Sequence, residues 1–175
     1  WKMEADGLIC PEYIEDLQTD YYFEEFSKIH IDGRIEVNIT QGEHFEVALT
    51  DKCDCSKNIE IVKFGDRLDI STDRHIHNAQ LNITMPYLEL LDIKHALNVT
   101  VRGFQQEAMT MWIENTNNRK TKAFLDVDEL TIKQKGNHEL EIIGAGKILK
   151  ATLDDYSDLD AERYEVDVAD ITAKG

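Results

Sequence analysis

The feature that most constrains this chain is a repeat of about 20 residues that fills its second half, from Leu90 to Gly175. Four segments there share one shape: a short strand with alternating apolar residues, a polar corner and a second short strand. Apolar pairs open these segments at offsets of 20, 19 and 19 residues: Leu91/Ile93, Met111/Ile113, Leu130/Ile132 and Leu149/Ala151. A unit of this size cannot bury its apolar face alone. The repeat therefore predicts a stack of coils, a β-solenoid, with Met111, Leu130 and Leu149 in one column.

The first half of the chain also reads as short strands, with alternating apolar residues separated by turn signals. Asp32-Gly33 and Gly65-Asp66 indicate hairpins, because glycine adopts positive φ angles freely. Strands at this spacing favour a β meander. The sequence thus predicts an all-β fold with almost no α-helix. Its predicted organisation is an N-terminal arm or cap at 1–25 and a single domain at 26–175, divided into a strand meander at 26–86 and repeat coils at 87–175.

The charge of the chain restricts its partners. The formal net charge is −16, so phosphate backbones and anionic membrane surfaces repel it, and nucleic acid is not an expected partner. No apolar run approaches the roughly 18 residues that suggest a membrane-spanning helix, and no transmembrane segment is predicted. Whether a leader precedes Trp1 and whether the natural chain continues past Gly175 both stay open.

Cysteine and histidine pairs offer a possible metal site. Cys53-Asp54-Cys55 and His75-Ile76-His77 lie in polar loops and would supply four zinc ligands if the loops met. The usual structural zinc spacing is C-x₂₋₄-C, however, so surface residues in polar loops are the favoured interpretation, and no metal or other cofactor is predicted. Two alternatives stay open: Cys10 forms a disulfide with Cys53 or Cys55, or all three thiols are free.

Several stretches carry a resemblance to a known family. The chain reads Phe26-Ser27-Lys28-Ile29-His30-Ile31-Asp32-Gly33 and then Ile35-Glu36-Val37-Asn38-Ile39-Thr40-Gln41-Gly42. This opening, the later segments Gly65–Ile70 and Ile83–Leu88, and the repeats that follow them resemble the putative auto-transporter adhesin, head GIN domain family. The resemblance covers about residues 26–175, although only traces of the family's small S-G-x-S/G corners remain.

The resemblance implies an extracytoplasmic all-β domain in the periplasm, on the outer surface or secreted, of a Gram-negative bacterium. It implies no catalytic residue. Independently, the sequence has no G-x-S-x-G, H-E-x-x-H or phosphate-binding glycine loop. We therefore expect a protein that is not an enzyme.

Two surface features are the candidate binding residues. The loop Asn115–Lys122 is the one repeat corner long enough to protrude, and it supplies Asn115, Asn117, Asn118 and Arg119. An acidic corner supplies Asp154, Asp155 and Asp158, with Asp126 and Asp128 expected on the coil beneath. Carboxylates that converge from stacked corners could hold Ca²⁺, but solvated turns are the favoured interpretation.

The predicted function is non-catalytic adhesion or surface binding, through outward side chains on a rigid stack of coils. The expected partner is a cell-surface glycan or protein, or a second copy bound through the edge of the solenoid. One alternative is a β-helical enzyme acting on polysaccharide, for which Asp92, Lys94 and His95, with Glu114 stacked above them, are the candidate groups. Another is a purely structural spacer of the cell envelope.

Overall fold

A computed structural model describes residues 2–4, 7–9, 17–51, 55–73, 75–76, 78–114, 119–154 and 156–174. Apart from one short 3-10 helix, η1 (Cys55–Asn58), all regular structure in these residues is β-strand, so the all-β prediction is confirmed for them. No helix among them is long and apolar enough to cross a bilayer. The strands are β1 (Lys2–Glu4), β2 (Gly7–Ile9), β3 (Leu17–Tyr21), β4 (Lys28–Asp32), β5 (Glu36–Gln41), β6 (Glu46–Asp51), β7 (Ile59–Phe64), β8 (Arg67–Thr72), β9 (His75–Ile76), β10 (Ala79–Met85), β11 (Leu90–Lys94), β12 (Val99–Glu114), β13 (Lys120–Lys135), β14 (Glu139–Ala145), β15 (Ile148–Asp154), β16 (Asp158–Glu165) and β17 (Val168–Lys174).

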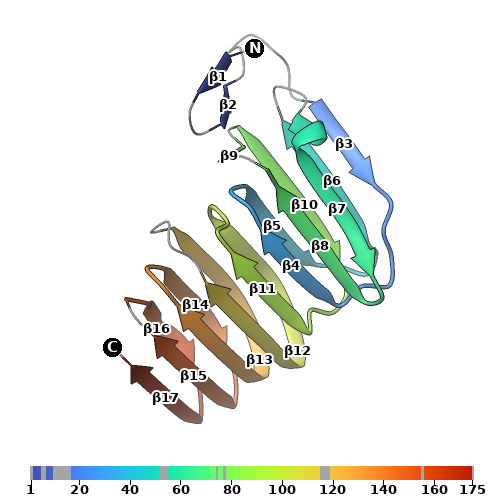
Figure 1. Cartoon of the computed structure of the whole chain (residues 1–175). Helices are drawn as coiled ribbons and strands as arrows, with labels where there is room; N and C mark the ends of the chain where they lie inside the picture. The colour runs from blue at the N-terminus through green and yellow to red at the C-terminus, as the bar shows by residue number, and fades with distance from the viewer. Residues whose placement is uncertain are drawn as a thin grey trace.

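Most of the described strands belong to one 14-stranded sheet that curls back on itself (Figure 1). Its first row runs β3-β6-β10-β5, continues through the first halves of β12 and β13, and ends with β14 and β16. Its second row runs β7-β8-β4-β11, continues through the second halves of β12 and β13, and ends with β15 and β17. The two long strands β12 and β13 therefore join the rows. A small sheet of β1, β2 and β9 is separate.

The parallel pairing reproduces much of the predicted repeat. Leu91 lies opposite Met111, and Leu130 lies opposite Leu149, as predicted. The link between these pairs was predicted wrongly, because Met111 lies opposite Ile132 and not opposite Leu130. A slip of two residues keeps every side chain on its own face of the sheet, so alternation alone cannot detect it.

The predicted meander in the first half is wrong in most of its pairings. Only β7 and β8 form the expected antiparallel hairpin, around Gly65-Asp66. Asp32-Gly33 is instead a corner between the rows, since β4 pairs with β8 and β11 whereas β5 pairs with β10 and β12. β10 also separates β5 from β6. A corner and a hairpin place similar turn residues between similar strands, which is why the local pattern did not distinguish them. The division into residues 1–25, 26–86 and 87–175 stays a prediction, although strands from all three stretches share the large sheet.

Inward side chains from both rows form one hydrophobic core. Parallel pairing stacks aliphatic residues of neighbouring strands in ladders, so each strand covers the apolar side chains of the next. The largest fully buried side chain is that of Phe104, in the middle of β12. The pairing of β12 with β13 shifts just before it, between Arg102 and Phe104, because the extra residue Gly103 (φ 79°) has no partner across the ladder.

One part of this core is polar. Gln134 takes an inward position of β13 and donates its Nε2 hydrogens to the backbone oxygens of His138 and Asp158, each at 2.9 Å. The Nε2 of His138 lies 2.9 Å from the Thr121 hydroxyl. All three side chains are buried. Burial alone lowers the pKa of His138 from 6.5 to about 4, so the ring is neutral in the folded protein at pH 7.

Candidate functional site

The outward face of the second row carries a shallow hollow, here called the Trp112 hollow. Parallel register builds it from two neighbouring ladders of side chains, Asp92–Trp112–Lys133 and Lys94–Glu114–Lys135. The hollow has a volume of about 410 Å³. Its lining residues are Asp92, Lys94, Trp112, Ile113, Glu114, Lys133 and Lys135.

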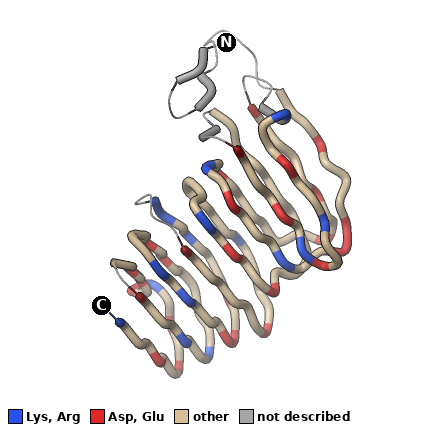
Figure 2. Tube along the Cα trace, in the orientation of Figure 1, with Lys and Arg blue, Asp and Glu red and all other residues tan. Residues whose placement is uncertain are grey.

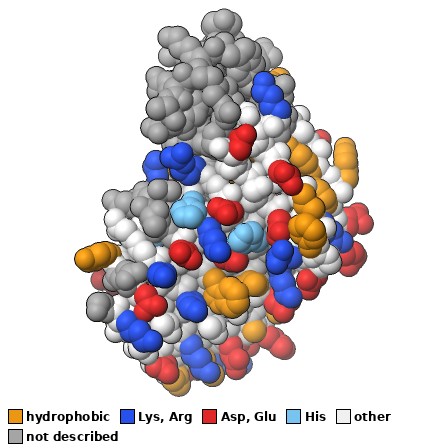
Figure 3. Space-filling model, viewed as in Figure 1, with side chains coloured by type: hydrophobic (Ala, Val, Ile, Leu, Met, Phe, Trp, Pro, Cys, Tyr) orange, Lys and Arg blue, Asp and Glu red, His pale blue; other side chains and the backbone are white. Residues whose placement is uncertain are grey.

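Trp112 is the main apolar group of this hollow. Its neighbours Met111 and Ile113 point into the core and are buried, so alternation turns the indole outward, where it is 47% exposed. Figure 3 shows this face of the molecule, with an apolar patch among acidic, basic and histidine side chains. A half-exposed indole on a flat sheet gives a ligand both a stacking surface and an N–H donor.

The Trp112 hollow is lined by three lysines and two acidic residues. Among the residues that the structure describes, Lys94, Lys133 and Lys135 make no ion pair. This is unusual in a chain of net charge −16, whose acidic residues lie along the whole length of the sheet (Figure 2). With three ammonium groups against two carboxylates, the lining of the hollow has a net positive charge beside an exposed aromatic ring, which suits an anionic group.

The acids of the hollow differ in their surroundings. The Oδ2 of Asp92 lies 2.9 Å from the Nδ1 of His30 on the adjacent strand. His95, which the sequence grouped with Asp92 and Lys94, lies instead against Asp32, at 3.4 Å. Of the expected stacking of Glu114 above Asp92, Lys94 and His95, the register confirms the position opposite Lys94, whereas Trp112 lies opposite Asp92. The structure thus forms the ladder that was considered for an enzyme, but one of its acids is bound to a histidine.

Basic residues on the opposite face, in the first row, are already neutralised. Lys120 lies 2.8 Å from a carboxylate oxygen of Glu141, and Lys122 lies 3.9 Å from the same atom. The hydrogen bond between Lys120 and Glu141 raises the pKa of the lysine and lowers that of the carboxylate. Lys122 also lies 5.3 Å from the centre of the Phe124 ring. These lysines are less available to an external anion than those of the Trp112 hollow.

Among the sequence-predicted binding residues, Asp154 lies beside this hollow, opposite its Lys135, and the others lie elsewhere or outside the described residues. Asn115, Asn117, Asn118 and Asp155 are outside them, as are the side chains of the cysteine and histidine pairs considered for zinc. Arg119 is exposed just before β13, and its backbone oxygen accepts a hydrogen bond from Glu139. Asp154 ends β15 and Asp158 begins β16, where the backbone of Asp158 is hydrogen bonded to His138 and Gln134. Their role in binding stays a prediction.

The acidic corner is not assembled as expected. Asp154 lies in register with Lys135 and Lys174, whereas Asp126 lies opposite Ala145. Asp128 pairs instead with Lys147, at 3.5 Å. Within the described residues, no group of three or more histidine, cysteine or acidic side chains is placed to hold a metal ion. The predicted stacking failed because a corner's place in the sheet depends on register, which the sequence pattern left undetermined.

Sequence reasoning had not singled out Trp112, Lys133 or Lys135. The signal was present, since outward positions follow directly from the inward pairs Met111/Ile113 and Leu130/Ile132. What the pattern lacked was the two-residue correction that places Lys133 beside Trp112.

The curled sheet and its parallel ladders define an all-β class of domain. The chain belongs to the family described as putative auto-transporter adhesin, head GIN domain, whose model matches residues 25–175. Membership implies a cell-surface or extracytoplasmic location in bacteria. No curated protein matches the chain.

Solved structures share the fold at low sequence identity. A putative adhesin from Bacteroides fragilis superposes with a TM-score of 0.78 and 16% identity, over 94% of this chain and 78% of that one. A putative adhesin from Parabacteroides merdae gives 0.63 and 12%, over 95% and 80%. A protein from Parabacteroides distasonis described as a putative lipid binding protein gives 0.61 and 10%, over 94% and 80%.

Proposed function

We propose that this chain is a non-catalytic binding domain exposed outside the cytoplasm of a Gram-negative bacterium, and that it holds an acidic glycan in the Trp112 hollow. The observation that carries the proposal is the half-exposed indole of Trp112 beside three lysines that make no ion pair within the described residues. A sugar ring would stack on the indole, and its carboxylate or sulfate would accept hydrogen bonds from the lysines.

A rigid coil stack suits this role. We propose that the parallel strands after Pro86 act as a β-solenoid, which is supported by register offsets of 20 residues between β11 and β12 and 19 between β13 and β15. Neighbouring strands lie about 4.8 Å apart, so outward side chains meet a ligand at a fixed spacing. The core beneath them fixes the backbone from which these side chains project, which lowers the cost of ordering on binding.

An enzyme acting on polysaccharide is the second candidate, favoured only by the position of Asp92 and Glu114 on neighbouring strands. The names of two structural relatives point to adhesion and that of a third to lipid binding, and none of the three points to catalysis. The two functions differ in outcome, because a binder retains an acidic polysaccharide intact whereas an enzyme shortens it. Self-association through a sheet edge and binding to a surface protein stay further possibilities for the partner.

The proposed function predicts that Trp112→Ala weakens retention on immobilised polygalacturonate by about tenfold or more, because an aromatic anchor at the centre of a site carries much of the binding energy. The double variant Lys133→Gln/Lys135→Gln should weaken it similarly and reduce its dependence on salt. Affinity is measured at two salt concentrations, with neutral dextran as the comparison polymer.

Two matched variants control this experiment. Tyr156→Ala removes an exposed aromatic ring elsewhere, and Lys150→Gln removes an exposed lysine of β15 outside the hollow. Both should retain wild-type affinity. Equal retention by Trp112→Ala would overturn the site, and release of reducing sugar ends by the wild-type protein would favour the enzyme.

A further inference from the structure

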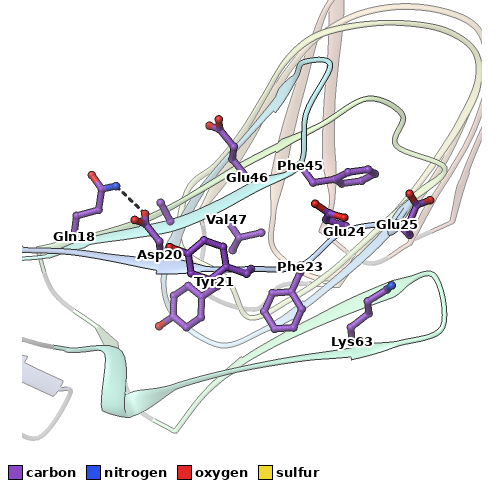
Figure 4. A pocket seen from close by; sticks show the side chains of 12 residues that line it. Gln18, Asp20, Tyr21, Phe23, Glu24, Glu25, Phe45, Glu46, Val47 and Lys63 are labelled. Atoms are coloured by element: carbon purple, nitrogen blue, oxygen red, sulfur yellow. Dashed lines mark hydrogen bonds between the residues drawn. The ribbon is translucent and has the colours of Figure 1, made fainter.

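A second concavity, here called the aromatic groove, lies where the two ends of the curled sheet approach each other. It has a volume of about 750 Å³, larger than the Trp112 hollow. Its lining joins β3 and β6 at one end of the sheet to Lys63 of β7 at the other (Figure 4). The residues that line it are Gln18, Asp20, Tyr21, Tyr22, Phe23, Glu24, Glu25, Phe45, Glu46, Val47, Ala48 and Lys63.

Aromatic rings form the apolar walls of this groove. Tyr22 is 92% exposed, which is exceptional for a large aromatic side chain. Phe45 is held from behind by the buried Phe26, with ring centres 4.9 Å apart. Phe26 is buried in the core, whereas the Tyr22 ring is open to solvent and can stack on a ligand.

The rim of the groove is negative. Glu24, Glu25 and Glu46 are exposed, and none of them makes an ion pair among the described residues. Glu25 adopts φ 57°, a left-handed conformation that is uncommon outside glycine, asparagine and aspartate. The turn that it forms places two successive glutamates beside the aromatic walls, as Figure 4 shows.

The groove also lies at a strand edge that no described strand covers. β3 pairs with β6 on one side and is the last strand of the sheet path in the described residues. Asp20 and Tyr21 both line the groove, although successive residues of a strand point to opposite faces. The concavity therefore reaches both faces of β3 and the edge that no described strand covers, where backbone N–H and C=O groups can pair with an added strand.

We propose that the aromatic groove binds an extended, basic peptide segment of a partner protein as an added strand next to β3. Alternate side chains of such a strand point to one face. Arginines on that face would meet the carboxylates of Glu24, Glu25 and Glu46 and stack on the Tyr22 and Phe45 rings. This site is separate from the Trp112 hollow and takes a ligand of opposite charge, so it does not depend on the proposed glycan function.

The test uses the full chain and a fluorescently labelled hexapeptide of alternating arginine and leucine, with fluorescence anisotropy as the readout. We expect saturable binding that weakens as salt rises. The triple variant Glu24→Gln/Glu25→Gln/Glu46→Gln should weaken binding by about tenfold or more, since three exposed attractions of this kind add to roughly one factor of ten. Tyr22→Ala should also weaken it.

The matched control is Glu107→Gln/Glu129→Gln/Glu162→Gln, which removes three exposed carboxylates outside the groove and should leave the affinity unchanged. Trp112→Ala should also leave it unchanged, which separates this site from the glycan site. The proposal would be overturned if the wild-type protein bound a glutamate–leucine peptide as tightly as the arginine–leucine peptide. It would also be overturned if the triple glutamine variant bound the arginine–leucine peptide as tightly as the wild-type protein does. Undiminished binding of an arginine–leucine peptide with N-methylated backbone would overturn it as well, because such a peptide cannot pair with the edge of β3.

Discussion

Phe104→Ala should lower the free energy of unfolding by about 3–5 kcal/mol, the usual cost of truncating a fully buried phenylalanine. Phe104 is 0% exposed and is the largest fully buried side chain among the described residues. It lies in β12, which belongs to both rows of the sheet, so the cavity would form where the rows are joined. Urea denaturation at pH 7.5, followed by circular dichroism, measures the change.

Phe64→Ala is the control for this substitution. The same atoms are removed, but Phe64 is 58% exposed at the end of β7 and its ring contacts only the Arg67 guanidinium, at 5.8 Å, among the ring and cation contacts of the described residues. Its loss should cost less than about 1 kcal/mol. Similar losses for the two variants would show that Phe104 is not packed as the structure describes.

Acid should destabilise this protein through His138. Its pKa falls from 6.5 to about 4 on folding, so between these values the unfolded chain binds a proton that the folded chain does not. A histidine with a lowered folded pKa contributes its full stability above pH 6.5 and loses it as the pH falls toward 4. Between pH 7.5 and pH 5.0 this one group should remove about 2 kcal/mol of the free energy of unfolding.

The measurement compares urea unfolding at these two pH values in wild type and in His138→Gln. The variant keeps a polar side chain within reach of Thr121 but cannot titrate, so its loss of stability on acidification should be smaller by about 2 kcal/mol. His44→Gln, which removes an exposed histidine between β5 and β6, should retain the wild-type loss. An unchanged loss in His138→Gln would contradict a buried neutral ring.

The alternation of apolar and polar residues along the strands determines how much of the fold could be predicted. A period of two assigns each residue to a face, and it did so correctly for Leu91, Met111 and Leu130, all buried. It does not assign a neighbour, because slips of two residues preserve the pattern. That is why the pattern pairs Met111 with Leu130 in place of Ile132, and why it does not distinguish the corners of the first half from hairpins.

For the same reason, only part of the site could be predicted from the sequence. Outward positions were predictable, and the position of Glu114 beside Lys94 followed from the correct offset between β11 and β12. The convergence of Trp112 with Lys133 needed the register of β13, which the sequence did not supply. His138 gave no signal of burial, since it follows a glycine-containing corner where polar residues normally meet water. Its burial depends on Gln134 and Thr121, which contact it only in the assembled sheet.

The unpaired Gly103 in β12 bears on which insertions and deletions the chain can survive. Length changes of one residue at this position are absorbed locally, because a bulge already exists there and the residues on either side keep their faces. One added residue between Leu130 and Ile132 would turn the rest of β13 inside out, bringing Lys133 into the core and Ile132 to the surface. Homologous chains should therefore vary in length at such bulges and at the corners, and hold a constant count within the ladders.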